Sequence, residues 1–172
     1  MNHNPFAALG LPSGSIIVEL LYMPSGALVV QIKDQWSNHS LWWRPVTPNA
    51  PYVPLMTPEA GQSLTSPKVS ADGRGVYCLL NVGNVPPGRG WSFGGLLYLD
   101  PATGLARNVI EPDSDNTWYV ADILAVEPHD ASLICVVGRQ LRGEPVMTYR
   151  VERFVLSDRR FEVICKLETP FA

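Results

Sequence analysis

The side chains that enzymes use most often in catalysis are scattered along this sequence. The three histidines, His3, His39 and His129, do not have the spacing of a metal site. No Gly-x-Ser-x-Gly segment or other nucleophile motif accompanies them. We therefore expect no catalytic histidine.

Acidic side chains are the remaining candidates for acid–base chemistry. Asp100, Asp113 and Asp115 lie in predicted loops, where carboxylates could act as the acid and base of a hydrolase. Residues 111–116 also place acidic oxygens at alternate positions, as the start of a calcium loop does. The glycine and the glutamate that complete such a loop are missing. We expect a solvated turn with no metal, and a hydrolase that uses loop carboxylates is one alternative function.

The three cysteines, Cys78, Cys135 and Cys165, are widely separated in the sequence. No Cys-x-x-Cys pair or Cys/His combination has zinc-site spacing. Cys78 and Cys135 each lie at the centre of an apolar run, where cysteine acts as a small buried hydrophobic group. We expect free thiols in a reducing cytoplasm and no cofactor.

Residues 83–95 read GNVPPGRGWSFGG and could be a phosphate-binding loop or a connection between strands. A phosphate loop leads into a helix and carries a Lys or Ser/Thr at fixed spacing. Here the glycines lead into the apolar run 96–99, and no Gly-Lys-Ser/Thr follows. A hairpin needs only about 2–5 residues, and loops longer than the fold needs often carry function. We predict that Arg89, Trp91 and Phe93 form a contact surface.

Adjacent Trp42 and Trp43 lie in a predicted strand, so their side chains should point to opposite faces. One of the two is expected in the core and the other in a groove or an interface. Tryptophan is common among interface anchors because it combines a large apolar area with a polar N–H group. We take Trp43 as the binding candidate.

Three segments share one pattern. Residues 69–80 (VSADGRGVYCLL) and 126–137 (VEPHDASLICVV) each consist of a valine, a polar turn and an apolar run with a central cysteine. Residues 22–30 (YMPSGALVV) are a shorter copy. Asp72-Gly73 and Ser25-Gly26 supply residues that tolerate positive φ in tight hairpins. The pattern indicates internal repeats.

Each copy is preceded by one predicted strand and followed by two, which gives four antiparallel strands in each unit. The runs 76–80 and 133–137 are apolar throughout, as is typical of strands covered on both faces. We predict an all-β protein with an N-terminal arm, residues 1–14, and a single domain, residues 15–172. The repeats fall at about 15–57, 64–111 and 118–168.

Residues 70–73 read SADG, and residues 97–104 read LYLDPATG. These segments resemble two motifs of the blade repeat in TolB-like and related WD-repeat β-propellers. The first is the turn before a blade's second strand, and the second is the segment that closes the third strand. The match is partial in the third unit, where His129-Asp130 replaces Asp-Gly, and faint in the first. The resemblance implies a radial stack of blade-like sheets and no particular activity.

Three units do not readily close a ring, since propellers usually have about four to eight blades. Either dimerisation completes a ring of about six blades, or the sheets form an open, propeller-like stack. A β-sandwich is the third option. An open array would expose apolar terminal faces, so we favour a homodimer or a tightly held partner.

The net charge of −3 and a pI near 5.5 argue against a nucleic-acid binder, which needs a basic surface. No apolar run approaches the ~20 residues of a membrane span, and the first residues do not read as a signal peptide. We therefore expect a protein partner, with no nucleic acid and no membrane.

The function expected from these features is that of a non-catalytic protein–protein interaction module. A narrower version is an inhibitor or immunity-type partner of another protein, which no residue specifically demands. A small-molecule or glycan binding β-protein is the main alternative to protein binding.

Overall fold

The computed structural model describes residues 9–47, 49–83, 91–115, 117–140 and 147–167. The chain forms three four-stranded antiparallel sheets, each a meander of strands that follow one another in sequence. The predicted all-β class with three four-stranded units is confirmed. The structure does not have the two packed sheets of the β-sandwich alternative.

The strands of each sheet are as follows. Sheet 1 contains β1 (Ile16–Tyr22), β2 (Leu28–Lys33), β3 (His39–Arg44) and β4 (Val53–Pro54). Sheet 2 contains β5 (Gln62–Val69), β6 (Val76–Gly83), β7 (Trp91–Asp100) and β8 (Leu105–Ile110). Sheet 3 contains β9 (Trp118–Val126), β10 (Ser132–Gln140), β11 (Met147–Val155) and β12 (Arg160–Lys166).

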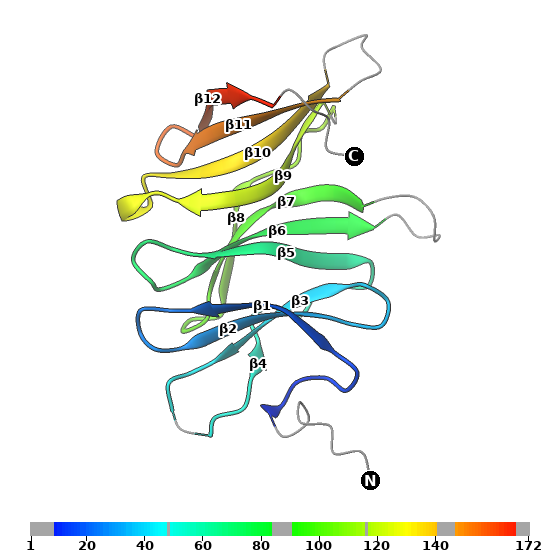
Figure 1. Cartoon of the computed structure of the whole chain (residues 1–172), viewed down its shortest axis with the longest axis vertical. Coiled ribbons are helices and arrows are strands. Elements are labelled where there is room, and N and C mark those ends of the chain that lie inside the picture. The colour runs from blue at the N-terminus through cyan, green and yellow to red at the C-terminus, as the bar shows by residue number, and fades with distance from the viewer. Residues whose placement is uncertain (1–8, 48, 84–90, 116, 141–146, 168–172) are drawn as a thin grey trace.

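The three sheets lie one above another, with sheet 2 in the middle (Figure 1). The strand β5 contacts β1 and β3 on one side and β9 on the other. The turns after β1, β5 and β9 all lie at one side of the stack, on the left in Figure 1. We call this the hairpin side and define it by residues 23–27, 70–75 and 127–131. In the described part of the chain, the sheets stack openly and do not close into a barrel.

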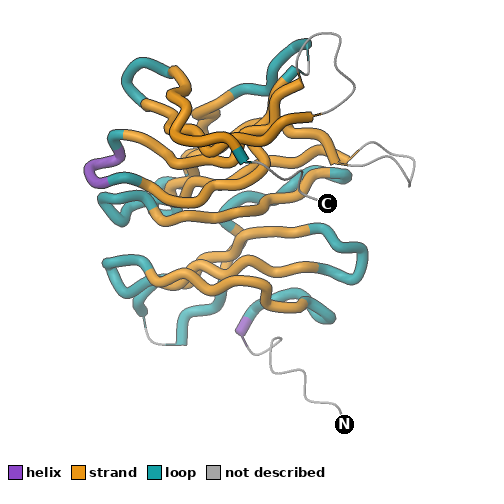
Figure 2. Tube along the Cα trace, turned by 45° about the horizontal axis from the view of Figure 1, so that its top comes forward, coloured by secondary structure: helices purple, strands orange, loops and turns teal. Residues whose placement is uncertain are grey.

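Residues with left-handed backbone conformations form the tight turns of the hairpin side. Gly26 and Gly73 have φ values of 87° and 69°, as the Ser-Gly and Asp-Gly pairs predict. The third turn, a short helical turn at Pro128–Asp130 (purple in Figure 2), places His129 and Asp130 in the same region, with φ of 62° and 50°. Positive φ at non-glycine residues is uncommon and needs compensation from the surrounding structure.

Asp130 provides that compensation by joining the third hairpin to the second. Its carboxylate accepts a hydrogen bond from the Ala71 N–H at 2.9 Å, and the Tyr77 hydroxyl bonds to the same side chain. Burial of the Tyr77 ring, with the nearby Asp130 charge, raises the pKa of its hydroxyl. The hydroxyl therefore stays protonated and continues to donate. Sheets 2 and 3 are thus tied together at their turns as well as through their core.

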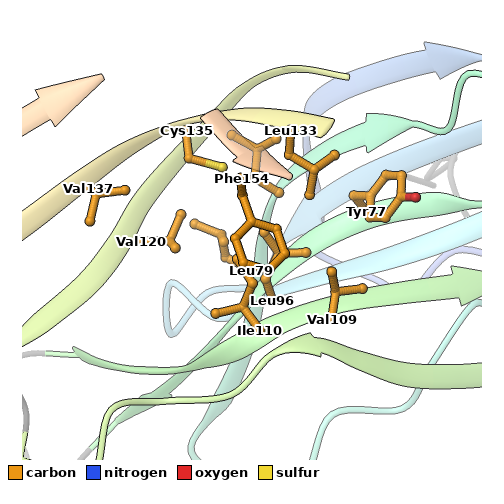
Figure 3. Packing of buried hydrophobic residues seen from close by; sticks show 11 residues of the cluster. Tyr77, Leu79, Leu96, Val109, Ile110, Val120, Leu133, Cys135, Val137 and Phe154 are labelled. Atoms are coloured by element: carbon orange, nitrogen blue, oxygen red, sulfur yellow. The ribbon is translucent and has the colours of Figure 1, made fainter. Parts of the chain in front are cut away.

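Apolar side chains fill both spaces between the sheets. From β6, Tyr77 and Leu79 belong to the core shared with sheet 3, and Val76 and Cys78 belong to the core shared with sheet 1. Figure 3 shows Leu79 with the other residues of the first cluster. The strand β6 is therefore covered on both faces, as its unbroken apolar run predicts.

The outer face of sheet 1 is covered by other parts of the same chain. Leu11 and Tyr52 pack onto Val30 and Ile32, and the Tyr52 N–H donates to the Leu9 carbonyl at 2.9 Å. The described part of the N-terminal arm therefore closes this end of the stack over β2.

Long polar side chains cover the outer face of sheet 3. The Tyr119 and Tyr149 hydroxyls are hydrogen-bonded at 2.7 Å, and Arg153 pairs with Glu127 at 2.9 Å and Glu162 at 3.8 Å. A polar outer layer of this kind is what the terminal repeat of a stacked array needs for solubility.

Candidate binding site

The two adjacent tryptophans of β3 point to opposite faces of sheet 1, as predicted. Trp42 packs with the cluster on the outer face, and its Nε1–H donates to the Ser40 hydroxyl at 3.0 Å. Trp43 packs against the core between sheets 1 and 2. The two indoles therefore differ in both packing and hydrogen bonding.

A cavity of about 430 Å³ lies beside Trp43 on the hairpin side. Its walls come from the β1–β2 turn, the segment after β3, and the turns that follow β5 and β7. Small residues in these turns, such as Ala27, Gly73 and Ala102, leave room in front of the indole. The larger apolar residues that line it are Met23, Trp43, Pro45, Val46 and Pro101.

The indole Nε1 of Trp43 is buried and has no hydrogen-bond partner among the described residues. An unpaired buried donor costs about 1–3 kcal/mol, and most such groups in native proteins are paired. Trp43 lines a mostly apolar cavity, and a bound group that carries an acceptor could pair this donor once the side chains that cover Nε1 move aside. The arrangement suits a ligand with an apolar body and one carbonyl or carboxylate oxygen.

Two charged residues lie at the cavity, Arg74 and Asp100. The Asp100 carboxylate accepts the Ala102 N–H at 2.9 Å and the Thr103 N–H at 3.3 Å, so it is engaged by its own turn. Arg74 is largely exposed and lies 3.9 Å from Asp72. Its guanidinium keeps donors available for a group bound at the rim.

The other predicted contact residues are elsewhere. Arg89 lies outside the described residues, and Trp91 begins β7, with its side chain outside the described part. Phe93 is half-buried between sheets 2 and 3, with its ring 6.4 Å from that of Trp118. Phe93 and Trp43 therefore belong to different intersheet clusters and do not form one surface.

Trp118, which lies beside Phe93, also contacts an ion pair that the sequence analysis did not predict. Arg139 donates to both carboxylate oxygens of Glu152, at 2.8 and 2.6 Å, and the Glu152 side chain is 0% exposed. The guanidinium also lies over the rings of Trp118 and Phe161. Hydrogen bonding to Glu152 raises the pKa of Arg139. The sequence clue was a glutamate two residues before Phe154, on the same side of β11 as that buried ring.

Two of the cysteines are buried and His39 is half-buried within the sheets. Burial raises the pKa of the Cys78 and Cys135 thiols to about 12, so neither forms a thiolate near neutral pH. Burial, with the nearby Lys33 charge, lowers the pKa of His39, whose Nδ1 lies 2.8 Å from the Gln31 side-chain amide. No group of three or more His, Cys, Asp or Glu residues in the described part could hold a metal ion.

Of the three loop carboxylates of the hydrolase alternative, Asp113 and Asp115 share one turn, and Asp100 lies apart from them. Asp100 lies at the end of β7, where it pairs with the first residue of β8, and Asp113 lies three residues after the last residue of β8. The two residues therefore flank opposite ends of one strand. The Asp113 carboxylate accepts hydrogen bonds from the Thr117 N–H and hydroxyl, which lower its pKa. These interactions are those of a turn-stabilising residue.

The comparisons with known proteins find similarity at the level of structure. No protein-family model and no curated protein matches the chain. Among solved structures, it is similar to a puromycin-hydrolyzing peptidase of Mycobacterium tuberculosis, with a TM-score of 0.52 and 15% identity over 90% of this chain. The chain spans about a quarter (24%) of the length of that protein. At this identity the similarity shows the fold alone.

The described residues also contain no helix that is long and apolar enough to cross a membrane.

Proposed function

We propose that this chain is a non-catalytic module that binds another protein, and that the cavity beside Trp43 receives an apolar side chain of the partner. The observation that carries the proposal is a mostly apolar cavity of about 430 Å³ beside Trp43, whose buried Nε1–H has no partner among the described residues. A polypeptide supplies both parts that the cavity lacks. An apolar side chain fills the space, and a backbone carbonyl accepts the indole hydrogen bond.

The composition of the wall supports a proline-rich or extended segment as the ligand. Trp43 lies with Pro45 and Pro101 in one wall, and grooves lined by aromatic side chains are common binding sites for such segments. Extended segments of this kind lose little conformational freedom on binding. The exposed guanidinium of Arg74 adds a donor for a second carbonyl or for an acidic residue of the partner.

Selection from a displayed library of random linear peptides tests this proposal, followed by titration of the selected peptides. Trp43→Phe keeps an aromatic ring and removes the donor, so we expect affinity to fall about fivefold or more. Ala102→Arg places a long side chain in the cavity and should abolish binding.

The matched control is Trp42→Phe, on the opposite face of the same strand. Its indole already donates to Ser40, so the substitution should leave peptide affinity unchanged. Thermal unfolding of each variant checks that the fold is retained. Selected peptides that bind Trp43→Phe and Ala102→Arg as tightly as the wild type would contradict the proposed site.

A small-molecule ligand is the second candidate function, because the cavity volume falls in the range of about 300–1,000 Å³ typical of ligand pockets. Thermal shifts with a panel of sugars and carboxylate-bearing apolar compounds test this alternative. A shift that Ala102→Arg removes would favour it over peptide binding if the peptide selection yields no cavity binder.

Two further expectations belong to the proposal. The free cysteines, with Cys165 exposed, are consistent with a reducing cytoplasm. The stacked meanders and the SADG turn at residues 70–73 support the interpretation of the three sheets as propeller-type blades.

A further inference from the structure

The first strand, β1, is an edge strand whose apolar side chains are mostly in water. It is hydrogen-bonded to β2 on one side only. Ile16 is 62% exposed, Leu20 44% and Tyr22 71%. One register shift lies next to Val18, and the pairing is regular from Glu19 to Tyr22. Within the described part of the chain, no strand pairs with the other edge of β1, and this edge therefore offers main-chain donors and acceptors flanked by apolar side chains.

The other edge strands carry features that discourage pairing beyond the single register shift of β1. On the outer edges, β4 has two residues and contains Pro54, and β8 carries Arg107 near its middle. On the inner edges, β5 contains Pro67 and a register shift, and β9 has two register shifts. The strand β12 carries several charged side chains: Arg160, Glu162 and Lys166. Prolines, charges and bulges are the devices by which natural sheets protect their edges.

The charge of β1 does not provide this protection. Glu19 is its single ionisable carboxylate, and it pairs with Lys68 of β5 at 3.7 Å. The strand therefore presents little net charge to repel a neighbour or to recruit a partner of opposite charge. Its contact surface is apolar side chains and main-chain groups, which a copy of the same strand complements.

The ends of the stack do not offer an equivalent surface. Leu11 and Tyr52 cover the outer face of sheet 1 over β2, and the Tyr119–Tyr149 pair lies on the outer face of sheet 3. A second copy that stacked face to face would have to displace these groups. Pairing along β1 displaces none of them.

We propose that β1 pairs antiparallel with β1 of a second copy of this chain and joins the two copies of sheet 1 into one continuous sheet. Such a contact is isologous, because the same patch is used on both copies. A register centred on Glu19 would put two like charges opposite each other, which is unfavourable. A register centred on Leu20 avoids this, and it places Leu20 opposite Leu20 and Val18 opposite Tyr22. The dimer therefore extends a sheet rather than closing a ring.

The test compares two leucines of almost equal exposure. Leu20 on β1 is 44% exposed, and Leu124 on β9 is 45% exposed. Light scattering coupled to gel filtration, over a concentration series, should give twice the chain mass of 18.9 kDa for the wild type and Leu124→Lys. Leu20→Lys places two cations at the symmetry axis and should weaken dimerisation at least tenfold.

Cysteine crosslinking tests the register. Leu20→Cys, in a Cys165→Ser background that removes the exposed native thiol, should form a disulfide-linked dimer on mild oxidation. The Met23–Ala27 hydrogen bond fixes the alternation along β1, so the main-chain groups of Leu20 face the free edge. Directly opposed residues of such a hydrogen-bonded antiparallel pair lie about 5.5 Å apart at Cα, which a disulfide can span. Leu124→Cys in the same background should stay monomeric on a non-reducing gel.

A wild-type protein of monomer mass across the series overturns the proposal, as does an unchanged dimer for Leu20→Lys. Circular dichroism shows whether Leu20→Lys is folded, and if it is not, the milder Leu20→Cys crosslink decides the question. Trp43→Phe should remain dimeric, so a failure of the peptide-binding proposal leaves this result unaffected.

Discussion

Glu152 has a fully buried side chain, and Arg139 is its ion-pair partner in the described part of the chain. Arg139 supplies two hydrogen bonds to it, while the rings of Trp118 and Phe161 surround the guanidinium. Removal of one member of a buried pair leaves an uncompensated charge, which costs about 3–5 kcal/mol. We therefore expect Arg139→Met to lower the free energy of unfolding by about that amount, measured by urea denaturation.

The double variant Arg139→Met, Glu152→Leu removes both charges and should recover most of the loss, since apolar replacements of whole buried pairs are often neutral. Arg160→Met is the exposed comparison. Arg160 pairs with Asp158 at 3.2 Å and Glu162 at 2.8 Å and is 62% exposed, so its loss should cost about 0–1 kcal/mol. A cost below about 1 kcal/mol for Arg139→Met would mean that water reaches Glu152.

At the scale of single elements, the hairpins of neighbouring sheets pack turn against turn. A Cβ atom at Gly73 would lie 2.6 Å from Cγ of Pro24, which belongs to the turn of sheet 1. Gly104 has almost the same φ, 70° against 69°, but has nothing within 4 Å of a Cβ. In both Gly→Ala variants, an alanine in the left-handed region should lower the free energy of unfolding by about 1 kcal/mol. In Gly73→Ala, overpacking against Pro24 should lower it by about 1–3 kcal/mol more.

Thermal unfolding of the two variants measures this difference. Addition of Pro24→Ala to Gly73→Ala should recover part of the extra loss by removing the atoms that clash. Equal destabilisation of Gly73→Ala and Gly104→Ala would mean that the two turns move apart freely and do not support each other.

The turns also mark how far the sequence predicts this structure. The local pairs Asp72-Gly73 and Ser25-Gly26 predict hairpins, and the apolar run of β6 predicts a strand covered on both faces. The roles of Asp130 and Arg139 could not be found in this way. Asp130 reaches Ala71 across 59 residues of sequence, and Arg139 meets Glu152 only through the β10–β11 register. Such contacts depend on how strands and sheets align.

For the same reason, the sequence predicts Trp43 as a binding residue but does not predict the cavity beside it. Strand alternation separates Trp43 from Trp42, and a binding role for one of them follows as a hypothesis. The cavity itself is formed where turns from two different sheets meet, so no local pattern contains it. The same holds for β1, whose exposure depends on the position of its sheet in the stack.

At the scale of the whole molecule, each end sheet is held mainly by its contact with sheet 2. Stability in such stacks is approximately a sum of unit and nearest-neighbour terms. Leu41 belongs to the core between sheets 1 and 2, and Phe154 belongs to the core between sheets 2 and 3. Leu41→Ala should lower the free energy of unfolding by about 2–5 kcal/mol, and Phe154→Ala should lower it by about 3–5 kcal/mol. The loss of stability should be confined to the end sheet that contains the substituted residue.

Native-state hydrogen exchange measures this confinement, because it reports the opening of separate parts of a fold. Leu41→Ala should speed amide exchange in β2 and β3 while β10 keeps its protection. Phe154→Ala should speed exchange in β10 and β11 while β2 keeps its protection. The two variants serve as controls for each other, since both remove buried side chains at intersheet cores. If either variant accelerates exchange equally in all three sheets, the stack unfolds as one cooperative unit, and the nearest-neighbour description is wrong for this protein.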